Sequence, residues 1–310
     1  MKRFFSILFA LALVGAVAAW FLSAPHPALA PGQFAALEPG ADAARGKLVF
    51  HAGGCASCHA TPGQDDRLKL GGGLALPSPF GTFYAPNISP HPADGIGAWS
   101  AGDLANAMLS GVSPQGAHYY PAFPYTSYQR ASAAEAADLM AFLRTLAPVT
   151  GKARGHDLPF PFNIRRTLGL WKLMFFEARP LPPDTAHDAE WRRGRHLVEG
   201  LSHCNECHTP RNILGGLDRS RAFGGAPNPE GKGMVPNITP DKGGLADWSK
   251  KDIVEVLATG FTPDYDSVGG SMASVVKNMA ELPAGDREAI AAYLKALPPV
   301  AGAAKVAKEK

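Results

Sequence analysis

The sequence contains the pattern Cys-x-x-Cys-His twice, at residues 55–59 and 204–208, and these two pentapeptides hold all four cysteines of the chain. Two thiols three positions apart can form thioether bonds to the two vinyl groups of one porphyrin, and the following His can bind its iron. We therefore predict two covalently bound haem c groups. The attachment residues are Cys55, Cys58, Cys204 and Cys207, and the proximal iron ligands are His59 and His208.

Two other uses of paired cysteines fit the sequence less well. A structural zinc site needs four ligands, often from a second pair at a set distance. Here the two pairs lie 149 residues apart and each ends in His. A redox-active disulfide would leave the repeated His unexplained. Haem attachment accounts for all of these residues.

The N-terminus carries an apolar run, Phe4 to Leu22, preceded by Lys2 and Arg3. Nineteen residues of helix span about 28 Å, close to the hydrocarbon thickness of about 30 Å, whereas a signal peptide usually has a shorter apolar core. A small-residue cleavage site exists at 28–30, but Pro31 follows it directly. We expect residues 1–30 to be an uncleaved transmembrane helix, with a cleaved signal segment as the alternative. The basic residues should stay in the cytoplasm, which places the haem domains in the periplasm.

Composition sets broader limits. A chain of 310 residues is long enough for two ordinary domains, and 46% hydrophobic residues fits a globular protein. The formal net charge of +3 gives no basis for a nucleic-acid partner.

The segments after the two motifs match one another at a nearly constant offset. Trp99-Ser100 corresponds to Trp248-Ser249, 149 residues later, and Pro86-Asn87-Ile88 corresponds to Pro236-Asn237-Ile238, 150 residues later. The chain is therefore a tandem duplication. The Asn87 and Asn237 segments are expected to line the haem pockets.

Each copy has the same expected helices. One precedes the haem motif, at 43–51 and 190–201; one opens at the capping boxes of Ser100 and Ser249; and one closes the copy, at 133–146 and 285–297. Helices separated by long loops around a haem are the plan of class I cytochrome c. The predicted fold is mostly α, with cytochrome c domain 1 at 31–150 and domain 2 at 189–300. An apolar segment at 151–188 should pack across both domains, or else form a docking surface, and the tail 301–310 should be disordered.

The second iron has a candidate distal ligand. Met272 lies 64 residues after His208, in the expected loop before the last helix. A Met sulfur at that position raises the reduction potential and suits electron transfer.

The first copy lacks this residue, because Phe123 stands at the position that corresponds to Met272. Three alternatives follow: His118, five residues earlier, binds the first iron; another Met reaches it, Met108 or Met140; or the site is open to small ligands. His118 ligation would put the first haem below the second in potential.

Several segments resemble the cytochrome c subunits of bacterial membrane-bound alcohol, gluconate and aldehyde dehydrogenases. In the first copy these are residues 53–59, 86–89, 95–100 and 120–125; in the second they are 208–212, 236–241 and 286–294. The best-known members of that family carry three haem domains and a Met at the position of Phe123, and this chain departs from both features.

The resemblance implies an electron-transfer subunit, not itself a catalyst. It would take electrons from a periplasmic or membrane-bound dehydrogenase and pass them to quinone, another cytochrome or a terminal oxidase of the respiratory chain. The predicted location is the inner membrane, with the haem domains in the periplasm. The alternative is an enzyme, a dihaem peroxidase or small-molecule oxidoreductase that acts at an open first haem.

Overall fold

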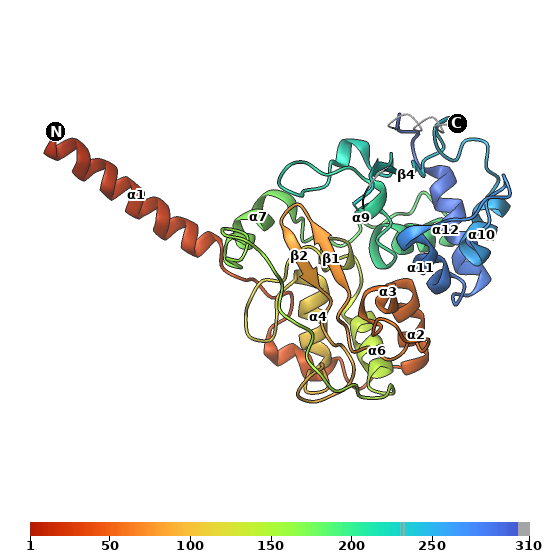
Figure 1. The fold of residues 1–310 in the computed structure, drawn as a ribbon, viewed down its shortest axis with the longest axis horizontal. Coiled ribbons are helices and arrows are strands. Elements are labelled where there is room, and N and C mark those ends of the chain that lie inside the picture. The colour runs from red at the N-terminus through yellow and green to blue at the C-terminus, as the bar shows by residue number, and fades with distance from the viewer. Residues whose placement is uncertain (230, 232, 303–310) are drawn as a thin grey trace.

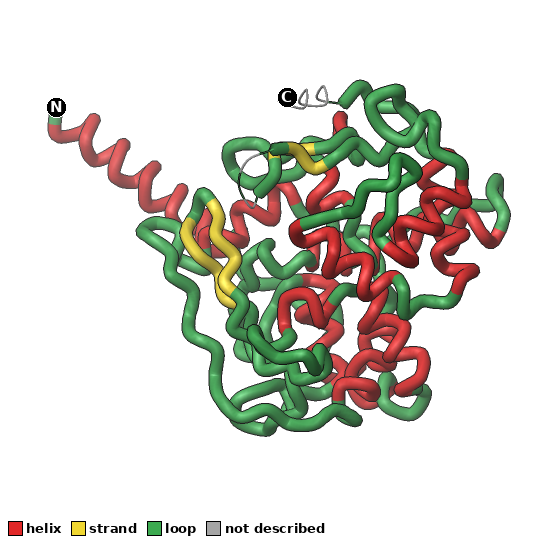
Figure 2. Tube along the Cα trace, turned by 45° about the vertical axis from the view of Figure 1, so that its right-hand side comes forward, coloured by secondary structure: helices red, strands yellow, loops and turns green. Residues whose placement is uncertain are grey.

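The computed structural model describes residues 1–229, 231 and 233–302. The described chain is mostly helical, with two short hairpins and long loops between the helices (Figures 1 and 2). Of the tail for which disorder is expected, residues 303–310 lie outside the described part.

Helix α1 (Lys2–Leu22) projects away from the rest of the molecule (Figure 1). It has no buried residue and is the one helix, among those in the described residues, that is long and apolar enough to cross a membrane. A signal sequence near the N-terminus can meet the same length and composition criteria. The apolar run thus forms the expected helix.

The first half, residues 31–150, is built from short helices around one hairpin. In chain order the elements are η1 (Pro31–Ala36), α2 (Ala43–Ala52), α3 (Cys55–His59), β1 (Ala75–Ser78), β2 (Gly81–Tyr84), α4 (Ala101–Ser110), α5 (Tyr125–Tyr128) and α6 (Ala133–Leu143). Strands β1 and β2 pair antiparallel, with Leu76 opposite Phe83.

The second half, residues 189–300, follows a similar order. Its elements are α8 (Ala189–His196), a π-helical turn η2 (Leu197–Leu201), α9 (Asn205–His208), η3 (Arg219–Arg221), β3 (Ala226–Pro227), β4 (Met234–Val235), α10 (Lys250–Thr259), α11 (Gly270–Met279) and α12 (Ala284–Ala296). Between the halves lies α7 (Thr167–Phe175), next to the base of α1 (Figure 1).

The capping boxes predicted from sequence are present. The Ser100 hydroxyl accepts the Asp103 N–H and the Asp103 carboxylate accepts the Ser100 N–H, so α4 begins at Ala101; Ser249 and Asp252 do the same for α10. Both helices end at a glycine with positive φ, 61° at Gly111 and 84° at Gly260. Side chains that satisfy the free N–H groups of the first turn fix where a helix starts.

The two halves share one way of crossing their first and last helices. A Cβ added to Gly46 in α2 would lie 1.9 Å from the Asp138 carbonyl oxygen in α6, and one added to Gly194 in α8 would lie 1.9 Å from the Ala289 oxygen in α12. Only glycine allows this close approach of backbones. An ion pair closes each crossing, Arg45 with Asp138 at 2.7 Å and Arg193 with Asp286 at 2.8 Å.

The expectation of a loop at Met272 is wrong. This residue lies in the first turn of α11, which begins after the extended Gly269 and continues to Met279. A capping-box signature is lacking there, and Gly269-Gly270 reads as a loop in the sequence. The helix forms because its buried residues Val276 and Met279 pack into the core.

The buried apolar residues of both halves form one continuous core. Phe50 and Tyr128 from the first half belong to the same cluster as Leu197, Leu201 and Met279 from the second. The halves are therefore packed together and not joined only by the chain between them.

Candidate haem-binding sites

The first Cys-x-x-Cys-His motif forms the one-turn helix α3, directly after α2. Gly54 joins the two helices with φ of 62°, a left-handed conformation that glycine adopts without strain. His59 ends the turn, and its Nδ1 lies 2.8 Å from the carbonyl oxygen of Pro86. The loop after the motif thus returns to hold the His ring.

The second motif has the same geometry. His203, with φ of 40°, occupies the place of Gly54, and α9 ends at His208. The Nδ1 of His208 lies 2.8 Å from the carbonyl oxygen of Pro236. The second copy therefore makes this turn with a strained backbone at His203, whereas the first copy makes it with glycine.

These contacts fix the state of both histidines. A proline carbonyl can only accept a hydrogen bond, so Nδ1 carries the proton and Nε2 keeps its lone pair. Burial lowers the pKa of His59 and of His208 more than the proline carbonyl raises it. Each motif thus presents a neutral imidazole with Nε2 free to bind a metal, and a second hydrogen bond that orients a ligand His is usual at such sites.

The asparagines after these prolines use their amides inside the protein. Asn87 Nδ2 donates to the Val149 carbonyl at 2.7 Å, and Asn237 Nδ2 donates to the Val300 carbonyl at 2.7 Å. Their side-chain oxygens accept the N–H of Ser89 and of Thr239. The two Asn side chains hold the proline loop against the residues that follow the last helix, a role that the sequence pattern did not indicate.

Among the described residues, none of the four cysteines forms a disulfide bond. Burial raises the pKa of Cys55 to about 12 and that of Cys204 to about 12. These thiols are neutral at pH 7, and with the oriented His of each motif they fit covalent attachment of haem.

The distal candidates differ between the halves. Met272 is partly buried and packs against the core cluster. Phe123 is also partly buried, but its ring packs against aromatic neighbours, 5.8 Å from Tyr119 and 5.6 Å from Tyr128 between ring centroids. Burial raises the pKa of Tyr119 to about 12, so this side chain is neutral. Met108 and Met140 lie deep in the core, 3% and 1% exposed.

His118 is buried, 2% exposed, and faces the end of α1. Its Nε2 donates to the Ser23 carbonyl oxygen at 2.9 Å, whereas Nδ1 is buried without a partner. Burial lowers the pKa of this ring, which is neutral. The nitrogen that histidine most readily offers to a metal is therefore used to hold the chain where it leaves α1.

The two motifs lie side by side across the contact between the halves. Gly53, just before Cys55, accepts hydrogen bonds from Tyr128 Oη at 2.6 Å and from His203 Nε2 at 3.3 Å. Asn278 of α11 donates to Ser57, between the first two cysteines, at 2.7 Å. Helix α11 thus carries Met272 at its start and touches the first motif near its end.

A second set of contacts reaches α9. The Glu206 carboxylate, inside the second motif, accepts the hydroxyls of Thr126 and Ser127 in α5, each at 2.6 Å, and is paired with Arg211. Further out, His196 Nε2 lies 2.7 Å from Glu135. The sequence offered no signal for these contacts, because they join residues 61 to 80 positions apart that no sequence pattern pairs.

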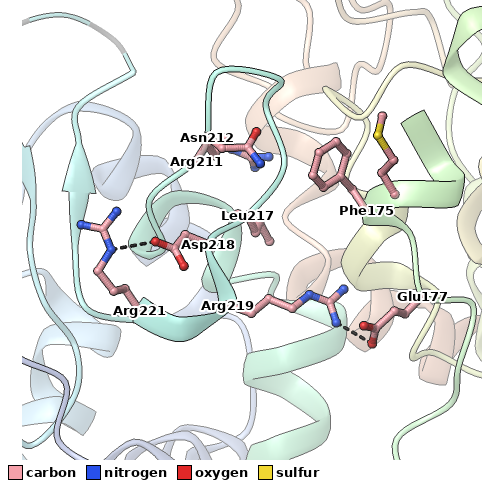
Figure 3. A pocket seen from close by; sticks show the side chains of 9 residues that line it. Phe175, Glu177, Arg211, Asn212, Leu217, Asp218, Arg219 and Arg221 are labelled. Carbon is pink, nitrogen blue, oxygen red and sulfur yellow. Dashed lines mark hydrogen bonds and ion pairs between the residues drawn. The ribbon is translucent and has the colours of Figure 1, made fainter. Parts of the chain in front are cut away.

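A cavity of about 410 Å³ opens beside the second motif, between the end of α7 and the loop 211–221 (Figure 3). Its three arginines are all paired: Arg211 with Glu206, Arg219 with Glu177 at 2.5 Å, and Arg221 with Asp218 at 2.8 Å. Neither proximal His lines it. All arginines of the cavity are thus compensated, and one of the ion pairs, Arg219 with Glu177, ties the linker to the second half.

Comparison with known proteins identifies relatives over almost the whole chain. The cytochrome c family model matches residues 43–147. A protein of Cereibacter sphaeroides named "Diheme cytochrome c-type" is 52% identical over 305 residues, which cover 97% of this chain and all of the relative.

Other relatives are larger. The fructose dehydrogenase cytochrome subunit of Gluconobacter japonicus is 38% identical, over 82% of this chain and 52% of its own length. The cytochrome c subunit of the quinone alcohol dehydrogenase of Gluconobacter oxydans is 34% identical, over 91% of this chain and 60% of its own length. The chain thus spans between half and two thirds of these two dehydrogenase subunits.

Proposed function

Since the chain belongs to the dihaem c-type cytochromes, we propose that it is an electron carrier, anchored in the inner membrane by α1, that links a dehydrogenase in the periplasm to the respiratory chain. Haem c, when bound, supplies a reversible one-electron change at iron. The observation that carries the proposal is the pair of histidines, His59 and His208, each oriented by a proline carbonyl directly after two cysteines that form no disulfide bond.

We propose one haem c for each half. Cys55, Cys58 and His59 would hold the first, and Cys204, Cys207 and His208 the second. The matched helix crossings, proline loops and Asn contacts support two tandem cytochrome c domains. The hydrogen bond from His203 Nε2 to the Gly53 carbonyl oxygen joins the two attachment sites, which suits transfer of an electron between them.

We further infer that the two sites differ on their distal sides. Met272 is the proposed sulfur ligand of the second iron. In the first half Phe123 offers no ligand atom, and the Nε2 of His118 is engaged with Ser23. Ligation by His118 would require either this bond to break or the unpartnered Nδ1 to bind iron.

The segment after α1 supports an anchor that is retained. Ser23 is 3% exposed and accepts the hydrogen bond of His118. Leu29 exchanges two hydrogen bonds with the Asn106 side chain, at 2.7 and 3.1 Å. Cleavage after Ala30 would remove these contacts from the first half. By the positive-inside rule, Lys2 and Arg3 support an N-terminus in the cytoplasm and haem domains in the periplasm.

The donor is proposed from the relatives. Two of them are named as cytochrome subunits of fructose and alcohol dehydrogenases, so a periplasmic or membrane-bound dehydrogenase is the proposed partner. Quinone, another cytochrome and a terminal oxidase remain the candidate acceptors.

A second function, reaction of peroxide or another small molecule at the first haem, has one observation in its favour. The distal loop of the first half presents Phe123 in place of a ligand. The partly buried Tyr119 and the buried Tyr128 beside it are neutral and are poor acid–base groups at pH 7. We therefore place this function second.

Isolation of the tagged full-length chain from detergent-solubilised membranes tests the leading proposal. We expect a dehydrogenase to co-purify, and its substrate to reduce both haems. The peroxidase proposal is favoured instead if no dehydrogenase is recovered and hydrogen peroxide oxidises the reduced protein in a saturable reaction. Recovery of the chain in the soluble fraction would contradict the anchor.

A further inference from the structure

Exposed large apolar side chains outside α1 are concentrated in one region. Of the eleven that follow α1 in the described residues, six lie between residues 160 and 174: Phe160, Phe162, Ile164, Leu170, Leu173 and Met174. Two more, Ile213 and Leu214, lie in a loop joined to this segment by the bond from Trp171 Nε1 to the Leu214 carbonyl oxygen, 2.9 Å. We call these eight residues the linker patch. So large a group of apolar side chains exposed together marks an interaction surface.

Helix α7 is docked by one side and leaves the other free. Gly169 is buried, and a Cβ there would lie 2.2 Å from the Ser23 carbonyl oxygen. Lys172 Nζ donates to the carbonyls of Ser110 and Gly111 at 2.7 and 2.9 Å. The exposed residues Leu170, Leu173 and Met174 recur at helical spacing and so share the opposite face. Loss of the contacts on the docked side would detach α7 from the body. Truncation of the side chains on the free face would change the stability of the fold little.

The docked side of α7 is fixed to the very end of α1. Arg166 donates to Ser23 Oγ at 2.9 Å and to the Trp20 carbonyl oxygen at 2.5 Å, and its guanidinium lies 4.4 Å above the Trp20 ring. Figure 1 shows α7 at the base of α1, on the same side of the body. The linker patch therefore sits where α1 leaves the body.

The length of α1 sets the depth of this region. Its 21 residues span about 32 Å, close to the hydrocarbon thickness of about 30 Å. If α1 crosses the bilayer, Trp20 and Ser23 lie at the far interface, where Trp is commonly found. The helix tied to them by Arg166 must then lie at the same depth.

We propose that the linker patch lies on the lipid bilayer, with the free face of α7 in the boundary between headgroups and acyl chains. The proposal rests on the membrane anchor proposed above, and the occupant is lipid because the patch is continuous with the end of α1. An apolar helix face beside a membrane-spanning segment is suited to this position. Two attachments, α1 and the linker patch, would fix the orientation of both haem sites relative to the membrane, as a single flexible tether could not.

The test uses the full-length protein alone in nanodiscs. A single cysteine is introduced by Leu173→Cys in the linker patch, by Val14→Cys in the middle of α1, or by Glu288→Cys on the exposed surface of α12, on the opposite side of the body in Figure 1. Each is labelled with a small thiol-reactive fluorophore, and the unsubstituted chain measures background labelling. Fluorescence is compared in nanodiscs with ordinary lipids and with lipids brominated near the headgroup end of the acyl chain.

We expect the brominated lipids to quench the label at 173 at least twofold and to leave the label at 288 unchanged. The label at 14 should also be quenched, because it reports the anchor. Quenching at 14 without quenching at 173 overturns the bilayer contact while the anchor stands. Absence of quenching at 14 contradicts the anchor, and the bilayer contact fails with it. Equal quenching at 173 and 288 would also overturn the proposal, since it would show no preferred face.

Discussion

The two halves of the molecule hold their predicted proximal histidines in the same way but differ in the residue at the predicted distal position. Each proximal His donates through Nδ1 to a proline carbonyl at 2.8 Å, and each proline is followed by an Asn that binds the backbone after the last helix. For the distal side, α11 carries Met272, the proposed ligand in the second half, whereas Phe123 lies among tyrosines at the corresponding position of the first half.

This difference shows which parts of a duplicated site are free to change. The attachment turn and the proline loop must be kept together, because each orients the other. The distal residue belongs to a separate segment, so it can be replaced without loss of haem attachment. A dihaem protein can thus hold two irons at different potentials on one architecture.

The largest effect is expected from removal of one attachment site. The double substitution Cys204→Ser and Cys207→Ser should lower the covalently bound haem from two groups to one per chain, measured by the mass of the intact protein. The matched pair Cys55→Ser and Cys58→Ser should do the same for the first half. Unchanged haem content in either variant would contradict two attachment sites.

The difference between the proposed distal residues can be removed by a substitution in either half. Met272→Ala should lower the potential of the second haem, and Phe123→Met should raise that of the first, each by a sizeable part of the roughly 0.8 V range that axial ligands span. Spectroscopic redox titration of both variants measures the shifts. If neither substitution moves a potential, the distal assignments in the two halves are incorrect.

The helix crossings have the same geometry in both halves. Substitutions there should have effects that are equal in the two halves and smaller than those of the preceding variants. Gly46→Ala and Gly194→Ala each place a Cβ 1.9 Å from a carbonyl oxygen of the facing helix. Each should lower the free energy of unfolding by about 1–3 kcal/mol, the usual cost of overpacking. Thermal unfolding measures this, with Gly155→Ala, where no atom lies within 4 Å, as the control. A large effect in one half alone would show that the helix crossings are not equivalent.

His118 separates the two readings of the first site. Because Nε2 is bonded to Ser23, we expect His118→Ala to leave the spin state of the first haem unchanged and to cost about 1–3 kcal/mol for the carbonyl left unpaired. Absorption and electron paramagnetic resonance spectra report the spin state. Conversion of a low-spin to a high-spin haem would instead identify His118 as the ligand.

The smallest effect concerns the contact between the halves. Burial raises the pKa of Glu135, but its bonds to His196 and Ser132 outweigh this and hold the pKa below the usual 4.5. A lowered carboxyl pKa stabilises the fold above the unfolded-state value and loses this contribution as the pH falls through the folded-state value. Glu135→Gln should therefore cost about 1 kcal/mol at pH 7 and less in acid. Denaturant unfolding at both pH values measures it, and an equal loss at both would show that the charge is not involved.

Much of the local structure could be read from the sequence. The capping boxes of Ser100 and Ser249 and the terminating Gly111 and Gly260 gave the limits of α4 and α10, because these residues act within one turn of their own position. The helix that holds Met272 could not be read, since it is stabilised by burial and not by a cap. The buried position of His118 was also hidden, because its partner Ser23 lies 95 residues away.

The sequence by itself determined the predicted chemistry: four thiols and two histidines at fixed spacing predict where haem attaches, since the covalent reach of a five-residue turn is a local property. Only the tertiary structure decided how these sites are used. In the folded chain, a proline carbonyl orients the His of each motif, and His118 is hydrogen-bonded to the residue after α1. The fold also brings His203 into contact with Gly53. These are contacts between distant residues, fixed by the packing of one shared core that no short pattern in the sequence encodes.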